Sequence, residues 1–191
     1  MITPHEIETL FEHQLSKIRN ADLTAKVIEV WVEGCRRGGW KSVDQLKSMP
    51  FTLLTNARGV NFIEHTIAVT EGALALAEAQ ASTYRALPYK IDHDRLIAGG
   101  LLHDVGKLLE IEPDAAGGFR KSRNGKCARH PISGAILVGA AGLPDELVNV
   151  VACHAKEGEG RPQVIETIFI HQADFATFDP LVMLEKGTLI Q

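Results

Sequence analysis

An adjacent histidine and aspartate, His103 and Asp104, end an apolar run and are followed by Gly106 and Lys107. An imidazole beside a carboxylate can provide ligands to two neighbouring cations, because one carboxylate can bridge them. Mixed nitrogen and oxygen ligands of this kind suit Fe, Mn or Zn. A single His-Asp pair can also simply cap the end of a helix, so the rest of the chain must decide between these interpretations.

Further histidines and a second aspartate stand in apolar surroundings on separate predicted helices. Burying so many polar groups in one small core is costly unless they are paired. Metal ions are suitable partners, since four imidazoles and two carboxylates can serve two cations and leave open positions for water or substrate. The sequence therefore predicts a binuclear metal site formed by His65, His103, Asp104, His130, His154 and Asp174.

Helical periodicity predicts the elements that carry these residues, and no strand pattern is present. Thr3 and Glu6 can form a capping box with Pro4 in the first turn, and Asp92 can cap the helix that leads into the central motif. We expect an all-α, single-domain helical bundle. The predicted helices cover residues 3–18, 23–35 and 42–49, segments that begin at 61, 92 and 130, and residues 143–154 and 163–178.

Length and composition are those of one ordinary globular domain. The chain has 191 residues, a formal net charge of -4 and three cysteines without a CxxC motif. It has no global basic field for a nucleic acid polymer, and no signal peptide or long apolar run is present. We therefore expect a cytoplasmic protein that does not associate with membranes, and the pattern specifies no oligomeric state. Residues 1–60 are predicted to be a helical extension packed on the core, 61–180 the metal-binding domain and 181–191 a tail.

Residues 117–129 contain five basic side chains and no acidic one. This segment is either a solvated loop or a basic arm for an anionic, phosphorylated ligand. Lys107 is a candidate for phosphate contact or an exposed lysine at a helix end, and His171 shares a helix face with Asp174 and either orients a ligand or only packs. The weaker phosphate candidates are Arg120, Lys121, Arg123, Lys126 and Arg129.

In this order the candidate ligands resemble the HD-domain superfamily of metal-dependent phosphohydrolases. The matching stretches are HDVGK at 103–107, RHPISGAILV at 129–138 and IHQADF at 170–175, within a resemblance that covers about 61–179. The resemblance implies an HD-type bundle with extra N-terminal helices. It also implies that His65, the HD pair and Asp174 hold one metal, while Asp104 bridges to a second metal held by His130 and His154.

The resemblance implies hydrolysis of a phosphomonoester or phosphodiester, such as a small nucleotide-like substrate, by a metal-activated water. Two divalent ions are expected, with Fe or Mn favoured and Zn, Ni or Mg as further options, and Asp104 and Lys107 are the catalytic candidates. Two alternatives remain open. The ligand set and the lysine also resemble mixed-valent di-iron oxygenases such as myo-inositol oxygenase, and a regulatory or interaction module could keep the metal for structure alone.

Overall fold

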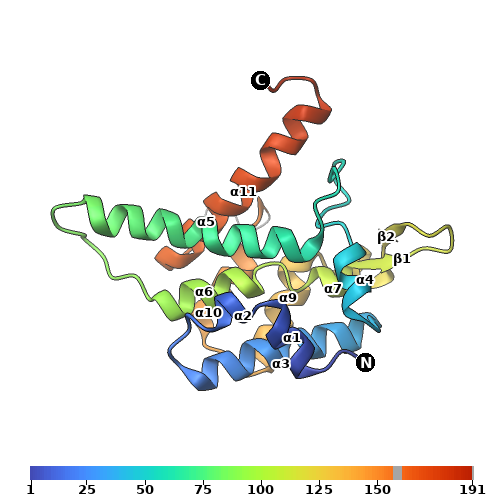
Figure 1. The fold of residues 1–191 in the computed structure, drawn as a ribbon, viewed down its shortest axis with the longest axis horizontal. Helices are drawn as coiled ribbons and strands as arrows, with labels where there is room; N and C mark the ends of the chain where they lie inside the picture. The colour runs from blue at the N-terminus through green and yellow to red at the C-terminus, as the bar shows by residue number, and fades with distance from the viewer. Residues whose placement is uncertain (157–160, 191) are drawn as a thin grey trace.

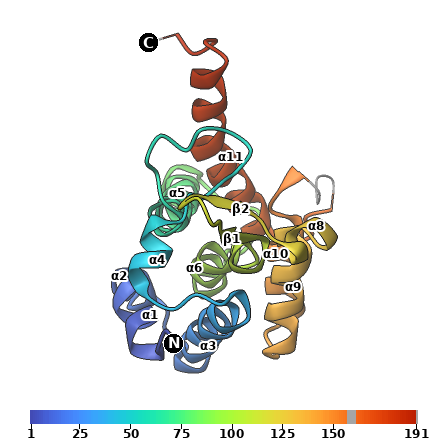
Figure 2. The same ribbon diagram turned by 90° about the vertical axis from the view of Figure 1, so that its right-hand side faces the viewer.

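The computed structural model of the protein describes residues 1–156 and 161–190. Helices dominate these residues, and their strands form one small two-stranded sheet, so the predicted all-α fold is confirmed. Helix α6 (His93–Leu102) lies in the middle of the bundle and is buried over most of its length. Four helices surround it in Figures 1 and 2: α3 (Ala21–Gly38), α5 (Phe62–Thr83), α10 (Asp145–Cys153) and α11 (Ile165–Glu185).

The first predicted helix starts as expected and ends early. Thr3 and Glu6 form the capping box of α1 (Pro4–Leu10), with Pro4 in its first turn. The prediction of one helix to about Ile18 is wrong, because the backbone leaves helical geometry at Phe11 before α2 (Glu12–Leu15). The ring of Phe11 is buried against Trp31, with 4.8 Å between their centroids, so the interruption lies where the chain is pressed onto the core.

Two tryptophans join the N-terminal helices to the centre of the bundle. Trp31 of α3 donates a hydrogen bond from Nε1 to the Leu101 carbonyl at 2.9 Å. Trp40, between α3 and α4 (Val43–Ser48), donates to the Leu108 carbonyl at 2.8 Å. These bonds hold α3 against α6 and α7 (Lys107–Glu110), on either side of the His-Asp pair.

Local sequence signals place the two helices that precede the central motif. Asn61 and Glu64 form a capping box that starts the 22-residue helix α5, and the Asp92 side chain caps α6 as predicted. Gly100 lets α5 and α6 approach closely, since a Cβ at this position would lie 2.7 Å from the Thr70 hydroxyl oxygen. The first turn of α5 and the end of α6 therefore meet at the same end of the pair.

The segment between α7 and α9 (His130–Ala140) differs from the sequence prediction. It forms a hairpin of β1 (Ile111–Pro113) and β2 (Phe119–Lys121), followed by the short helix α8 (Arg123–Cys127). The Asp114 side chain accepts hydrogen bonds from the backbone N–H groups of Ala116 and Gly118 and so stabilises the turn. Strands of three residues are too short to show an alternating pattern, which is why the prediction of no strand was wrong.

Helix α11 is longer than its predicted end near Phe178, because it continues through Pro180 to Glu185. Pro180 is exposed and costs the helix one backbone hydrogen bond without ending it. Figure 1 shows that the C-terminal part of α11 extends away from the other helices. Of the helices that the structure describes, none has both the length and the apolar composition needed to cross a bilayer.

Candidate metal centre

The His-Asp pair lies in a tight turn between α6 and α7, and Gly106 allows the turn to rest on the start of α9. A Cβ on Gly106 would lie 2.0 Å from the His130 carbonyl oxygen and 2.7 Å from the Gly134 nitrogen. Only a residue without a side chain permits this backbone approach. The glycine of the HDVGK stretch thus brings Asp104 next to His130, although 25 residues, which include α7, the hairpin and α8, separate them in sequence.

The Asp104 carboxylate is buried at the centre of the cluster, and its two oxygens face different histidines. Oδ2 lies 3.2 Å from His65 Nε2 and 3.3 Å from His103 Nε2. Oδ1 lies 3.3 Å from His130 Nε2 and 3.5 Å from His154 Nε2. The structure therefore sets one carboxylate between two pairs of imidazoles, which is the geometry that a bridging ligand requires.

Asp174 completes the first of these groups. It projects from α11, and its Oδ1 lies 3.2 Å from His65 Nε2. Two sets of ligand atoms can each hold one ion: His65, His103, Asp104 and Asp174 in one, and Asp104, His130 and His154 in the other. The structure brings all six predicted ligands together, from five separate parts of the bundle.

Each imidazole of the cluster is oriented by an acceptor at its Nδ1 atom. A carbonyl or carboxylate at this atom fixes the proton on Nδ1 and leaves the Nε2 lone pair free toward Asp104. Thr177 plays the same part, since its hydroxyl donates to the Asp174 carbonyl and so accepts from the imidazole. The pairs are His65 with Thr177 Oγ1 (3.2 Å), His103 with the Gly100 carbonyl (2.6 Å), His130 with Glu110 Oε2 (3.0 Å) and His154 with the Val151 carbonyl (2.9 Å).

Electrostatics favour charged carboxylates in this buried cluster. Burial raises the pKa of Asp104, but the Lys107 ammonium and the neighbouring His103 outweigh it and hold that pKa well below its ordinary value. Burial also opposes ionisation of Asp174, and its close contact with the His65 imidazole outweighs burial and lowers its pKa. Burial lowers the pKa of His130, which favours the neutral imidazole. Charged carboxylates and neutral imidazoles are the forms that bind metal ions.

Two buried atoms of the cluster have no hydrogen-bond partner among the described residues: Asp104 Oδ1 and His154 Nε2. A buried polar atom without a partner costs about 1–3 kcal/mol. Both atoms point to the position between Asp104, His130 and His154, where a cation would satisfy them together. The residues present therefore fit a metal centre better than a purely structural network of hydrogen bonds.

A pocket of about 630 Å³ opens beside the cluster, and His130 and Asp174 form part of its wall. Lys107, Lys121 and Arg129 line it, so three of the predicted phosphate candidates face this space. The other three do not belong to its lining. Arg120 pairs with Glu112 at 2.9 Å on the exposed face of the hairpin, and Arg123 and Lys126 are exposed on α8.

His171 contacts the cluster through the backbone of His154. Its Nδ1 donates a hydrogen bond to the His154 carbonyl at 2.5 Å, and its ring packs on Phe175. It thereby supports the backbone that carries His154.

Sequence reasoning missed Glu110, which is buried beside His130. Its Oε2 accepts from the backbone N–H and the Nδ1–H of His130, while its Oε1 contacts Arg129 and Lys121 at 2.9 and 3.5 Å. Burial raises the pKa of Glu110, but these hydrogen bonds and charges outweigh it and lower the pKa to about 2. A single acid in the apolar stretch from Leu108 to Ile111 was the available signal.

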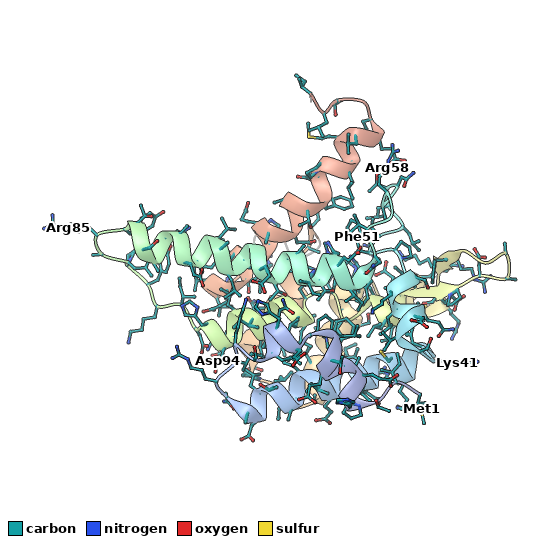
Figure 3. All side chains as sticks on the ribbon, viewed as in Figure 1. Met1, Lys41, Phe51, Arg58, Arg85 and Asp94 are labelled. Carbon is teal, nitrogen blue, oxygen red and sulfur yellow. The ribbon has the colours of Figure 1, made fainter. Side chains whose placement is uncertain are left out.

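Sequence reasoning also missed Phe51, which lies between α4 and α5. Its fully buried ring stacks on the His65 imidazole with 4.2 Å between centroids. Figure 3 shows Phe51 at the base of the loop that leads to α5, while Arg58 lies on the outer part of the same loop.

Comparison with known proteins agrees with this arrangement. The HD domain family matches residues 62–176, which is more than half of the chain, and the chain belongs to this family. It is similar to ribonuclease Y of Pseudothermotoga lettingae, with 25% identity over 173 residues, 91% of this chain and 29% of that protein. It is also similar to the dihydroneopterin 2',3'-cyclic phosphate phosphodiesterase of Methanocaldococcus jannaschii, with 32% identity over 115 residues, 60% of this chain and 45% of that protein.

The chain thus spans less than half the length of each of these relatives. No solved structure matches it significantly.

Proposed function

We propose that the protein is a metal-dependent phosphohydrolase that cleaves small phosphodiesters. The observation that carries this proposal is the division of the Asp104 oxygens between two groups of ligands, beside a pocket lined by cations. The names of both kinds of relative support a diester, since one is a phosphodiesterase and RNA is itself a phosphodiester chain.

The proposed ligands of the first ion are His65, His103, Asp104 and Asp174, and those of the second are Asp104, His130 and His154. Two divalent ions at these positions would acidify a water molecule toward neutral pH and neutralise the charge that develops on phosphorus. The Nδ1 acceptors hold the four imidazoles in the orientation that binding requires. Each group contributes one residue to the pocket wall, Asp174 from the first and His130 from the second, and the second group has one protein ligand fewer, so it leaves more room for water and substrate.

Lys107 is the proposed contact to the phosphate nearest the ions. Its ammonium lies 2.5 Å from Asp104 Oδ2 and also lines the pocket. Lys121 and Arg129 lie farther along the same wall, where Glu110 holds them. Positive groups fixed before the substrate arrives stabilise the phosphorane-like charge without a cost of reorganisation.

A small substrate fits the dimensions and the charge of the protein better than a polymer. The pocket of about 630 Å³ matches a drug-sized ligand, and the net charge of -4 gives no general attraction for a nucleic acid chain. The ribonuclease relatives make RNA the natural second substrate to test. The comparisons give no support to the di-iron oxygenase alternative.

The test uses protein purified without added metal and then supplied with Mn²⁺ or Fe²⁺. We expect metal-dependent release of nitrophenolate from bis(4-nitrophenyl) phosphate, and loss of this activity in Asp104→Ala. A broad panel of phosphodiesters and phosphomonoesters without any turnover would refute the proposal. Consumption of O2 by the iron-loaded protein would instead favour the oxygenase. If substitution of His103 or Asp104 left the activity of the protein in cells intact, the interaction module would be favoured.

A further inference from the structure

The pocket beside the metal centre has two chemically different sides. Lys107, Lys121 and Arg129 lie on the side of α7 and the hairpin. The other side is formed by the loop before α5 and by α11, and most of it is apolar. Its apolar residues are Phe51, Leu53, Leu54, Phe175 and Phe178, and its polar residues are Thr52 and Asp174.

The exposure of this apolar side indicates that something covers it. Leu54 is 70% exposed and Leu53 is 42% exposed, and both line the same pocket as Phe178. Leucines that face the same space as phenyl rings form a continuous apolar patch, and such patches on proteins mark binding sites. The cations that line the same pocket indicate that the ligand also carries negative charge.

The apolar side is held in place before any ligand binds. Phe51 stacks on His65, lies 5.5 Å below the Lys107 ammonium and meets Phe178 edge to face at 6.4 Å. The loop is joined to α11, because the backbone N–H of Asn56 and the hydroxyl of Thr55 both donate to Glu185. A ligand therefore meets a preformed apolar surface, in which the buried ring of Phe51 supports Phe178 beside the proposed metal ligand His65.

This side offers little for hydrogen bonding. The hydroxyl oxygen of Thr52 already accepts from the Leu54 backbone N–H. The one carboxylate on this side is Asp174, which belongs to the proposed ligands of the first ion, and no amide side chain of the described lining residues is present to read polar substituents of a ring. The surface therefore selects for a flat, uncharged group by contact and stacking, and discriminates weakly between rings.

We propose that the substrate is a phosphoester of an aromatic alcohol, with the phosphate at the metal centre and the ring against Phe178 and Leu54. This inference rests on the proposed phosphohydrolase function and adds the class of alcohol that the site accepts. If the inference holds, the affinity of the protein for a ligand depends on the aromatic ring as well as on the phosphate group.

Binding of two non-hydrolysable probes tests the inference independently of turnover. Phenylphosphonate and methylphosphonate carry the same anionic group and differ in the ring, and their affinities for the Mn²⁺-loaded protein are measured by calorimetry. We expect phenylphosphonate to bind about tenfold tighter or more, since the ring leaves water on binding. Phe178→Ala should weaken the binding of phenylphosphonate by about three- to tenfold and leave the affinity for methylphosphonate unchanged.

Leu54→Ala provides a variant that cannot disturb the core, because the side chain is largely exposed. It should also weaken the binding of phenylphosphonate and leave the affinity for methylphosphonate unchanged. Met183→Ala is the matched control, on the same helix and outside the pocket lining. Equal affinities of the wild-type protein for the two phosphonates would overturn the inference. So would an equal decrease of both affinities in Phe178→Ala and Leu54→Ala. Neither result bears on phosphohydrolase activity itself. Selective binding of phenylphosphonate without hydrolysis of any phosphoester would uphold the ligand class and refute the proposed function.

Discussion

Glu110 Oε2 accepts hydrogen bonds from both the backbone N–H and the Nδ1–H of His130, at 2.5 and 3.0 Å. Among the residues that the structure describes, the other three imidazoles of the cluster have neutral acceptors at Nδ1, and only His130 is backed by a carboxylate. Glu110 therefore links a candidate metal ligand to the cations Arg129 and Lys121 of the pocket.

We predict that Glu110→Gln weakens binding of the second ion by about 10- to 100-fold, because the amide lacks the charge that makes His130 a better ligand. Chelator competition with the purified protein measures the two affinities. Glu112→Gln, which removes a carboxylate on the exposed side of the hairpin, is the control and should change neither. Unaltered affinities in Glu110→Gln would show that the contact serves packing alone.

Asp104→Ala should abolish binding of both ions, whereas His65→Ala should affect mainly the ion of the first group. The reason is geometric, since the two Asp104 oxygens face both groups and His65 faces one. Elemental analysis of the purified variants gives the metal content per chain. His93→Ala, an exposed residue at the start of α6, should retain both ions. The bridging role would be wrong if Asp104→Ala and His65→Ala lost metal equally and completely.

Gly106→Ala should destabilise the fold by about 3 kcal/mol, since the new Cβ would meet the His130 carbonyl at 2.0 Å. Gly139→Ala is the matched substitution on α9, where the nearest atom lies at 3.9 Å. It should stabilise the helix by about 0.5–1 kcal/mol. Urea unfolding of the two variants decides the matter, and similar midpoints would contradict the proposed backbone approach.

The cysteines should differ sharply in reactivity. Burial raises the pKa of the Cys35 thiol to about 12, so almost no thiolate is present below that pH, and the side chain is inaccessible. Cys127 is exposed on α8. At pH 8 we expect iodoacetamide to modify Cys127 within minutes and Cys35 only after denaturant is added, as peptide mass analysis would show. Prompt labelling of Cys35 in the native protein would mean that α3 separates readily from the core.

The six candidate ligands could be found from the sequence because each is a polar residue in an apolar segment, and burial makes such residues conspicuous. The order of those residues also led to the correct family and to the helical fold. Glu110 obeys the same rule and was overlooked, since its partner His130 lies beyond a hairpin that three-residue strands do not reveal. Phe51 and Leu54 follow no period, and their role depends on the distant α11, which sequence position alone does not specify.

The separation of the ligands along the chain has a consequence for heat stability. An ion held by His65, Asp104 and Asp174 would tie α5 and α11 to the turn after α6, and a second ion would add the ends of α9 and α10. Such a cross-link exists only in the folded chain, so occupancy adds to the free energy of unfolding by mass action. The melting temperature of this protein should therefore rise with free metal concentration and fall on addition of a chelator.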